Sequence, residues 1–423
     1  MYTGLNIEVF GRYLFYMDYL QATEILEKYG QQHVLDYYEE LTDAQKQSLL
    51  DQIEATDFSV LDQINAPESK QKGKITPIKA MTLDEIDADY TNYRLRGLNE
   101  IQAGHVGAVL LAGGMGTRLG SDNPKGMYDI GLTKPRYIFE CLIRNLLDVV
   151  QETGCYIPLF VMTSDKNHEA TTAFMKEKNY FGYDPSYIHF FKQDMAPAAT
   201  YEGKVYMEDT WKIATSPNGN GGWFSSMKRA GILDVIHEKG IQWLNVFAVD
   251  NVLQRIADPI FIGATASHSC NVGAKVVRKA DPDEKVGVMC LKDGHPSIVE
   301  YYELTDELRN TMDENGEPAY NFGVILNYLF AVNSLEAICD KTMPLHIVEK
   351  KIPYMDDSKT LIKPDEPNGY KFETLILDMI QMMDTCLPFE VVRGKEFSTI
   401  KNKTGVDSVE SARALLQENG VTL

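Results

Sequence analysis

Apolar residues recur at helical spacing along the first 66 residues of this 423-residue chain. Leu49, Leu50 and Ile53 lie on one face of such a helix, and Thr42 followed by Gln45 is typical of a capping box at its start. This part of the chain carries no recognisable chemistry. The pattern therefore predicts an N-terminal helical region whose role is packing or docking.

The composition changes from Pro67 to about Thr82, where lysine, glycine and proline gather in a polar stretch. Such a stretch indicates a linker or an extended crossover. A second helical pattern then runs from Leu83 to Gln102. We expect residues 1–100 to form a helical region with its linker.

A short continuous apolar run, Val106–Ala112, then predicts a buried parallel strand. Further strands are predicted at Tyr156–Thr163, Ile188–Phe191, Trp243–Val249, Lys275–Val277, Val286–Leu291 and Ile298–Tyr302. Helical patterns lie between several of them, at Ile138–Val150, Lys166–Lys178 and Phe224–Lys239. Strands that alternate with helices predict an α/β fold whose ligands bind at the carboxyl ends of the strands.

The part of the chain from about Pro364 is predicted to be a small C-terminal region. A helical run at Phe372–Met383, a strand at Phe389–Arg393 and a helix at Ser408–Asn419 make it up. The predicted division of the chain is therefore 1–100, 101–363 and 364–423.

The net charge of the chain limits the kinds of molecule that it can bind. The chain has 41 Lys and Arg against 61 Asp and Glu, a formal net charge of −20. This balance argues against wide contact with nucleic acid or with an anionic membrane surface. The sequence has no apolar run of transmembrane length, its first twenty residues lack a signal-peptide core, and its six cysteines show no metal-binding spacing. A cytoplasmic protein with reduced thiols is expected.

The clearest chemical signal follows the first predicted strand, where residues 111–120 read Leu-Ala-Gly-Gly-Met-Gly-Thr-Arg-Leu-Gly. Three closely spaced glycines allow a sharp turn whose amides can surround an anion. Arg118 and Lys125 add positive charge suited to phosphate. A dinucleotide fingerprint, and with it a nicotinamide dehydrogenase, is disfavoured because Leu119 replaces the third glycine, and no P-loop motif occurs.

The glycine turn with Arg118 and Pro124-Lys125 resembles the signature of sugar-1-phosphate nucleotidyltransferases. The chain is similar over a much longer stretch to the eukaryotic-type UDP-N-acetylglucosamine (UDP-N-acetylhexosamine) pyrophosphorylases. The matching segments occur in one order at Pro124–Leu132, Met162–Ser164, Phe190–Pro197, Pro217–Gly222, Val249–Asn251, Gly273–Val277, Val299–Tyr301, Lys351–Tyr354, Ile362–Lys371 and Glu396–Asn402. The resemblance implies a Rossmann-like mixed sheet, flanked by the N-terminal helical segment and a small C-terminal domain.

The resemblance also implies roles for individual residues. The expected nucleotide-binding residues are Ala112, Gly113, Gly114, Gly116, Thr117, Gln193 and Gly219, with Gln193 on the uracil edge. The expected sugar-binding residues are Asn220, Gly287, Glu300 and Asn321. Arg118, Lys125, Lys371 and Lys401 are expected to act on the phosphates, and Asp250 to hold Mg²⁺. One carboxylate is enough, because Mg²⁺ completes its octahedron with phosphate and water.

The chain departs from the family near the expected sugar site. Val324 stands where the family usually has an asparagine that contacts the sugar, and Leu375 and Leu377 replace two aromatic residues. The sequence also ends at Leu423, before much of the family's β-rich C-terminal domain.

The sequence therefore predicts a uridylyltransferase. Its substrates would be UTP and a sugar 1-phosphate, above all N-acetylglucosamine 1-phosphate, and its products a UDP-sugar and pyrophosphate. The same chemistry on glucose or galactose 1-phosphate is one alternative, and a non-catalytic UDP-sugar-binding protein is another. No nucleic-acid or membrane partner is expected.

Overall fold

The apolar run after residue 105 forms strand β4 (Val106–Leu111), and all six of its residues are buried in the computed structural model. The structure describes residues 8–9, 12–13, 17–64, 73–314, 316–339 and 341–423. Part of the expected linker, residues 65–72, lies outside the described residues. Its later part contains strand β3 (Ile75–Pro77).

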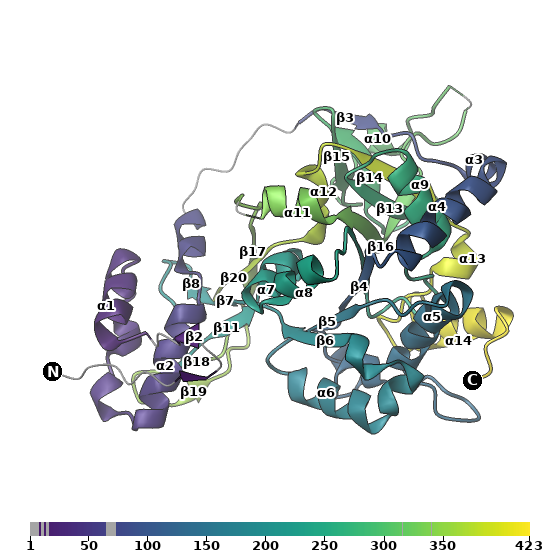
Figure 1. Ribbon diagram of the computed structural model, residues 1–423. Helices are drawn as coiled ribbons and strands as arrows, with labels where there is room; N and C mark the ends of the chain where they lie inside the picture. The colour runs from purple at the N-terminus through teal and green to yellow at the C-terminus, as the bar shows by residue number, and fades with distance from the viewer. Residues whose placement is uncertain (1–7, 10–11, 14–16, 65–72, 315, 340) are drawn as a thin grey trace. The chain divides into compact units, whose positions relative to one another are not determined.

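Strand β4 lies inside a large mixed sheet, which among the described residues has ten strands. The main path runs in the order β15 (His295–Val299), β14 (Val288–Lys292), β16 (Phe322–Ala331), β12 (Trp243–Ala248), β4, β5 (Leu159–Thr163), β6 (Ile188–Lys192). Off this path, β13 (Val272–Arg278) pairs with β16 and with β21 (Cys386–Glu390), and β3 pairs with β14. β12, β4, β5 and β6 run parallel, so their carboxyl ends share one edge. Figure 1 labels three of these strands, β4, β5 and β6.

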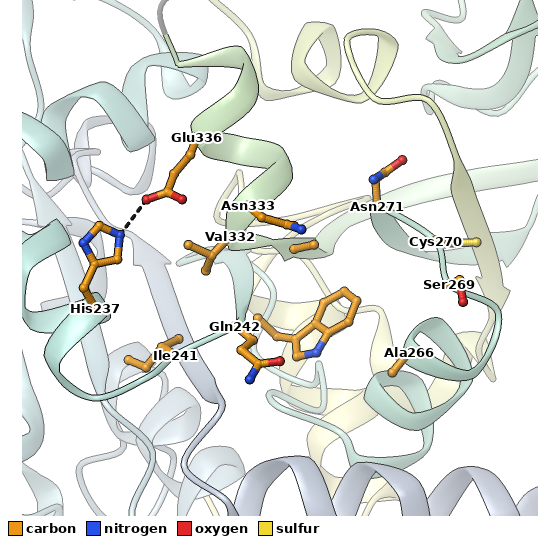
Figure 2. Close-up of a pocket in the computed structure, with 12 residues that line it drawn as sticks. His237, Ile241, Gln242, Ala266, Ser269, Cys270, Asn271, Val332, Asn333 and Glu336 are labelled. Carbon is orange, nitrogen blue, oxygen red and sulfur yellow. Dashed lines mark hydrogen bonds and ion pairs between the residues drawn. The ribbon is translucent and has the colours of Figure 1, made fainter.

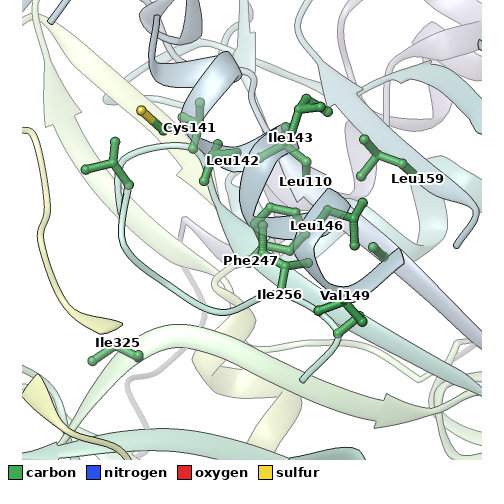
Figure 3. Packing of buried hydrophobic residues seen from close by; sticks show 14 of the residues in the cluster. Leu110, Cys141, Leu142, Ile143, Leu146, Val149, Leu159, Phe247, Ile256 and Ile325 are labelled. Atoms are coloured by element: carbon green, nitrogen blue, oxygen red, sulfur yellow. The ribbon is translucent and has the colours of Figure 1, made fainter. Parts of the chain in front are cut away.

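Helix α5 (Ile138–Thr153) covers one face of these parallel strands. Nine of its residues are buried, at the spacing expected for an amphipathic helix. Figure 3 shows its side chains among those of the sheet, where Leu146 lies near Leu110 of β4 and Phe247 of β12. This core fixes the strands whose ends carry the expected site.

Other α-helices lie between the strands of the large sheet in sequence or follow its last strand. They are α3 (Leu83–Ala88), α4 (Tyr90–Gln102), α6 (His168–Glu177), α7 (Trp223–Arg229), α8 (Ile232–Glu238), α9 (Pro259–Ser267), α10 (Asp306–Arg309), α11 (Val332–Ile338), α12 (Ile376–Gln381), α13 (Arg393–Glu396) and α14 (Val409–Glu418). None of the helices in the described part of the chain has both the length and the apolar character needed to cross a membrane.

The chain divides into two compact units that are discontinuous in sequence. One takes residues 1–70, 194–222 and 343–375, and the other takes residues 71–193, 223–342 and 376–423. The large sheet lies wholly in the second unit, together with the last 48 residues. The boundaries at residues 100 and 363 stay a prediction.

The first unit combines the N-terminal helices with small antiparallel pairs of strands. Its helices are α1 (Tyr19–Lys28) and α2 (Asp43–Ala55), and the predicted capping box of Thr42 and Gln45 is confirmed at the start of α2. Its strands are β1 (Glu8–Val9), β2 (Arg12–Tyr13), β7 (Met195–Pro197), β8 (Ala199–Thr200), β9 (Met207–Asp209), β10 (Lys212–Ile213), β11 (Thr215–Pro217), β17 (His346–Lys350), β18 (Tyr354–Met355), β19 (Leu361–Ile362) and β20 (Gly369–Glu373).

Several local predictions are wrong, among them those at Phe372, Glu300 and Gly231. The helical run predicted from Phe372 begins in strand β20, where Phe372 pairs with Ile347, and α12 starts only at Ile376. Strand β15 ends at Val299, so Glu300 lies outside the predicted strand, just before the turn at residues 301–303. The helix predicted over Phe224–Lys239 is two helices, separated at Gly231, whose φ of +73° ends helical geometry.

Candidate functional site

The glycine loop, residues 112–120, leaves the carboxyl end of β4. It is folded by its own backbone: the Gly116 amide donates to the Asn123 carbonyl at 2.8 Å, and the Lys125 amide donates to the Gly114 carbonyl at 3.1 Å. These two hydrogen bonds bring the segment around Lys125 back against the loop. The loop and this lysine therefore form one structure at the edge of the sheet.

Gln193 lies directly over Gly113. A Cβ atom on Gly113 would lie 2.7 Å from Oε1 of Gln193, so only glycine leaves this side chain in place. The backbone amide of Gln193 donates to the Thr163 carbonyl at 2.7 Å, which ties this residue to the end of β5. At Gly114 an added Cβ would meet nothing within 4 Å. The backbone of the loop is thus open at Gly114, next to a carboxamide that suits a uracil edge.

Asn167 holds this corner together and is absent from the sequence prediction. Its side chain is fully buried, its amide donates to the Ala112 carbonyl at 2.8 Å, and its Oδ1 accepts from the Ser164 amide at 2.8 Å. An asparagine just before a helix is usually interpreted as an N-cap. That local interpretation gives no sign of its contact with Ala112, which begins the glycine loop 55 residues earlier.

Positive charge gathers beside the loop. Nζ of Lys125 lies 3.7 Å from Oδ2 of Asp250, which follows the end of β12. Burial lowers the pKa of Lys125 below its ordinary value, the neighbouring Arg118 and Lys401 lower it too, and Asp250 opposes them. The structure therefore brings together four predicted residues, three cations and one carboxylate, that are up to 283 positions apart.

The C-terminal segment reaches this cluster by pairing with the turn after β12. The Ile400 amide donates to the Asp250 carbonyl at 2.9 Å, and the Val252 amide donates to the Ser398 carbonyl at 3.1 Å. Lys401 comes next in the chain, and its Nζ lies 3.1 Å from Oδ2 of Asp407. These backbone bonds place Lys401 beside Asp250 independently of any ligand.

A buried lysine anchors the start of that segment. Lys275 on β13 is 0% exposed, and its Nζ lies 2.6 Å from Oε2 of Glu396 and 3.1 Å from Oδ2 of Asp258. It also donates to the Arg255 carbonyl at 3.1 Å. Lys275 therefore joins the segment that carries Lys401 to the turn that carries Asp250.

The predicted residues Gly219, Asn220 and Lys371 lie in the first unit. Gly219 has a φ of +86°, and a Cβ atom there would collide with the carbonyl oxygen of Thr374. The Gly221 amide donates to the same carbonyl at 2.9 Å. Lys371 is on β20, opposite Val348 of β17. The second glycine turn and strand β20 are thus joined within one unit.

The sequence model of the family described as UTP–glucose-1-phosphate uridylyltransferase matches residues 57–423. The chain belongs to this family. It is 36% identical over 410 residues to the UDP-N-acetylglucosamine pyrophosphorylase of Saccharomyces cerevisiae, covering 92% of this chain and 84% of that one. It is 34% identical over 421 residues to the mouse UDP-N-acetylhexosamine pyrophosphorylase-like protein 1, covering 93% and 83%.

Solved structures of similar proteins have the same fold as this chain. A putative UDP-N-acetylglucosamine pyrophosphorylase from Entamoeba histolytica has a TM-score of 0.74 at 33% identity, covering 82% of this chain and 88% of its own. The uridine diphosphate N-acetylglucosamine pyrophosphorylase from Trypanosoma brucei has a TM-score of 0.78 at 26% identity, covering 93% and 83%. The predicted Rossmann-like mixed α/β fold is confirmed.

The uridylyltransferase family generally uses a divalent metal ion. Among the described residues, no group of three or more His, Cys, Asp and Glu side chains could hold a metal. Asp250 offers a single carboxylate whose side chain is 23% exposed. This donor fits an ion that takes one or two carboxylates and completes its shell with phosphate and water.

Two residues of the expected sugar site, Gly287 and Glu300, lie close together in the second unit. An added Cβ on Gly287 would lie 3.7 Å from Oε1 of Glu300 and 3.5 Å from Cγ2 of Val324. The Val324 amide donates to the Gly287 carbonyl at 2.9 Å. The side-chain oxygen of Asn321 accepts from the Lys279 amide at 3.2 Å. Val324, which offers no side-chain hydrogen bond, thus stands beside the predicted sugar-binding pair.

A separate hollow of about 560 Å³ lies near the other end of β12. Trp243, the first residue of that strand, lines it together with Gln242, and the hydrogen bond between Nε2 of His237 and Oε1 of Glu336 at 2.6 Å borders it (Figure 2). None of the predicted site residues lines this hollow. The amino-terminal end of β12 is therefore distinct from the edge that carries Asp250.

Proposed function

We propose that this member of the uridylyltransferase family makes UDP-N-acetylglucosamine and pyrophosphate from UTP and N-acetylglucosamine 1-phosphate, with Mg²⁺ as its metal. The observation that carries the proposal is the cluster of Arg118, Lys125, Lys401 and Asp250 at the glycine loop. The relatives named as UDP-N-acetylglucosamine pyrophosphorylases support the choice of sugar.

The reaction needs no protein nucleophile. A phosphate oxygen of the sugar 1-phosphate forms a bond to the α-phosphorus of UTP, the bond from that phosphorus to the bridging oxygen breaks, and pyrophosphate leaves with the electron pair. Because the nucleophile is already an anion, no general base is required. Catalysis then depends on positioning and on neutralising charge.

Residues in and beside the glycine loop would contact different parts of UTP. Gln193 over Gly113 would hold the uracil edge, and the open backbone at Gly114 would let the nucleotide approach closely. Arg118 and Lys125 would contact the phosphates. Because burial and the neighbouring cations lower the pKa of Lys125, an anionic phosphate beside it relieves an unfavourable crowding of positive charge.

Asp250 would hold the Mg²⁺ ion, which when bound supplies Lewis-acid stabilisation of phosphate charge. Lys401 is held beside Asp250 by the backbone pairing of residues 398–400 with residues 250–252. Glu300 would accept hydrogen bonds from the sugar hydroxyls, Gly287 would offer its backbone to the same sugar, and Asn321 would bind the sugar as well. Gly219 is proposed to bind the nucleotide, Asn220 the sugar and Lys371 the phosphates.

The same reaction on glucose 1-phosphate is a second candidate, because Val324 stands beside Gly287 and Glu300 with an apolar side chain. Such a side chain leaves no hydrogen bond to select an N-acetyl sugar at that point. We also propose that the protein works in a reducing compartment such as the cytoplasm. Its six cysteines, all among the described residues, are unpaired.

The test is a substrate panel. The protein is incubated with UTP, Mg²⁺ and the 1-phosphates of N-acetylglucosamine, glucose or galactose, and pyrophosphate release is measured. We expect the highest kcat/KM with N-acetylglucosamine 1-phosphate. A preference for glucose 1-phosphate would support the second candidate, whereas UDP-sugar binding without turnover of any hexose 1-phosphate would contradict the enzyme assignment.

A further inference from the structure

Lys403 extends across the far end of the glycine loop. If Gly120 carried a Cβ atom, that atom would lie 2.7 Å from Nζ of Lys403 and 3.1 Å from its Cε. Gly120 has a φ of +67°, which also favours glycine. The absence of a side chain at Gly120 thus creates the space that the ammonium group of Lys403 occupies.

The loop that carries Lys403 is closed by its neighbours rather than loosely attached. The Lys401 and Asn402 amides both donate to the Asp407 carbonyl, at 2.7 and 3.0 Å, and Oδ1 of Asp407 accepts from the Thr399 hydroxyl at 2.6 Å. The Val409 amide donates to the Asn402 carbonyl at 3.0 Å. Residues 403–406 therefore form a short loop with a fixed base.

The ammonium group of Lys403 has no carboxylate within ion-pairing distance among the residues that the structure describes. Its neighbour Lys401 differs, because Asp407 already pairs with it at 3.1 Å. An exposed lysine usually extends into water, but this one lies against the loop that follows β4. Three N–H donors are thus presented at this point without an acidic partner.

The position along the loop indicates which part of a ligand would meet Lys403. Gln193 marks the base end of the loop at Gly113, and Gly120 lies seven residues further on, after Arg118. We propose that Nζ of Lys403 binds the terminal phosphate of UTP and, after the reaction, the released pyrophosphate. This inference rests on the proposed uridylyltransferase function.

The assignment predicts discrimination between ligands. UTP and pyrophosphate carry the phosphate that Lys403 would contact, whereas a UDP-sugar has no γ-phosphate. Removal of Lys403 should therefore weaken the first two ligands and leave the third nearly unchanged. A general disturbance of the loop would instead weaken all three, because all would use the amides near Gly114.

The experiment compares Lys403→Ala and Lys403→Arg with the full-length wild type. Lys395→Ala is the matched control, since it removes an exposed lysine from the same C-terminal segment. We measure KM for UTP in the forward direction, KM for pyrophosphate in the reverse direction, and Kd for UDP-N-acetylglucosamine by calorimetry. Thermal unfolding of each variant shows whether its fold is retained.

We expect Lys403→Ala to raise KM for UTP and for pyrophosphate by about tenfold, the typical effect of one charge-assisted hydrogen bond. Kd for the UDP-sugar should change less than twofold, and arginine should restore most of the loss. Unchanged KM values, or an equal loss for all three ligands, would overturn the role of Lys403. A wild type without any uridylyltransferase activity would instead overturn the proposed function itself.

Discussion

Replacement of Lys275 by methionine tests how the C-terminal segment is anchored. Lys275 is 0% exposed, and its Nζ contacts Oε2 of Glu396 at 2.6 Å, Oδ2 of Asp258 at 3.1 Å and the carbonyl of Arg255 at 3.1 Å. Methionine has a similar length but no charge and no donor. The variant therefore leaves two carboxylates and a carbonyl without their shared partner while filling most of the volume.

The expected loss in the free energy of unfolding follows from the burial of the ion pair between Lys275 and Glu396. Removing one partner of a buried ion pair typically destabilises a protein by about 3–5 kcal/mol, because an uncompensated charge remains. Asp258 retains a partner in the variant, because its Oδ1 lies 3.5 Å from Nε of Arg255, so most of the lost stability should come from Glu396. A loss of this size is a large part of the roughly 5–15 kcal/mol that stabilises a typical domain.

The destabilisation should depend on pH. Burial raises the pKa of Glu396, and Lys275 is the main opposing influence, so this pKa rises further in the variant. A group whose pKa is raised in the folded state stabilises the fold most below its unfolded pKa, about 4.3, and this contribution is lost as pH rises through the folded pKa. The variant should therefore be least destabilised in mild acid and most destabilised at alkaline pH.

The assay is urea unfolding of the wild type and of Lys275→Met at pH 5.5, 7 and 8.5, with Lys395→Met as the control for an exposed lysine. In the double variant with Glu396→Gln, much of the lost free energy of unfolding should return, because no buried carboxylate is then left without a partner at that position. A loss below about 1 kcal/mol at pH 7, or one that does not change with pH, would refute the reasoning, since only an exposed or screened pair behaves so.

Three further outcomes are expected. Lys125→Ala should lower kcat/KM by at least about a hundredfold, the usual effect of losing a preorganised charged donor, with an unchanged melting temperature. Steady-state kinetics measure this loss, and near-normal turnover would remove Lys125 from the mechanism. Val324→Asn should raise the preference for N-acetylglucosamine 1-phosphate over glucose 1-phosphate by about tenfold, the effect of one hydrogen bond of roughly 1.4 kcal/mol; an unchanged ratio in the substrate panel would contradict it. Excess chelator should abolish pyrophosphate release and added Mg²⁺ should restore it, whereas full activity in chelator would disprove metal dependence.

Much of the fold was predictable because its signals are local. The apolar run of β4, the glycines that follow it and the capping box at Thr42 each report on a structure within a few residues. Asp250 could also be placed, because a polar residue that ends a buried parallel strand must lie at the edge where such sheets bind ligands.

The rest could not be predicted because it depends on contacts between distant segments. Strand β16 is absent from the predictions, although it pairs with β12, β13 and β14. Its apolar residues resemble those of a buried helix until these partners are known. Lys275 looked like an ordinary strand residue, since nothing near it in sequence reveals carboxylates that lie 17 and 121 positions away. Asn167 was hidden for the same reason.

The distribution of charge explains why the site needs these long-range contacts. A chain with a net charge of −20 cannot attract a triphosphate through its overall field, so the cations must be concentrated at one place. Concentrating them is unfavourable in the free protein: burial is the main cause of the lowered pKa of Lys125, and the neighbouring Arg118 and Lys401 lower this pKa further. Asp250 and Asp407 reduce that cost by pairing with Lys125 and Lys401 before any ligand binds. Lys401 belongs to the C-terminal segment, and the backbone hydrogen bonds from Ile400 to Asp250 and from Val252 to Ser398 hold this segment beside the other cations. If these cations bind phosphate as proposed, the contribution of Lys401 depends on the contacts that hold this segment in place.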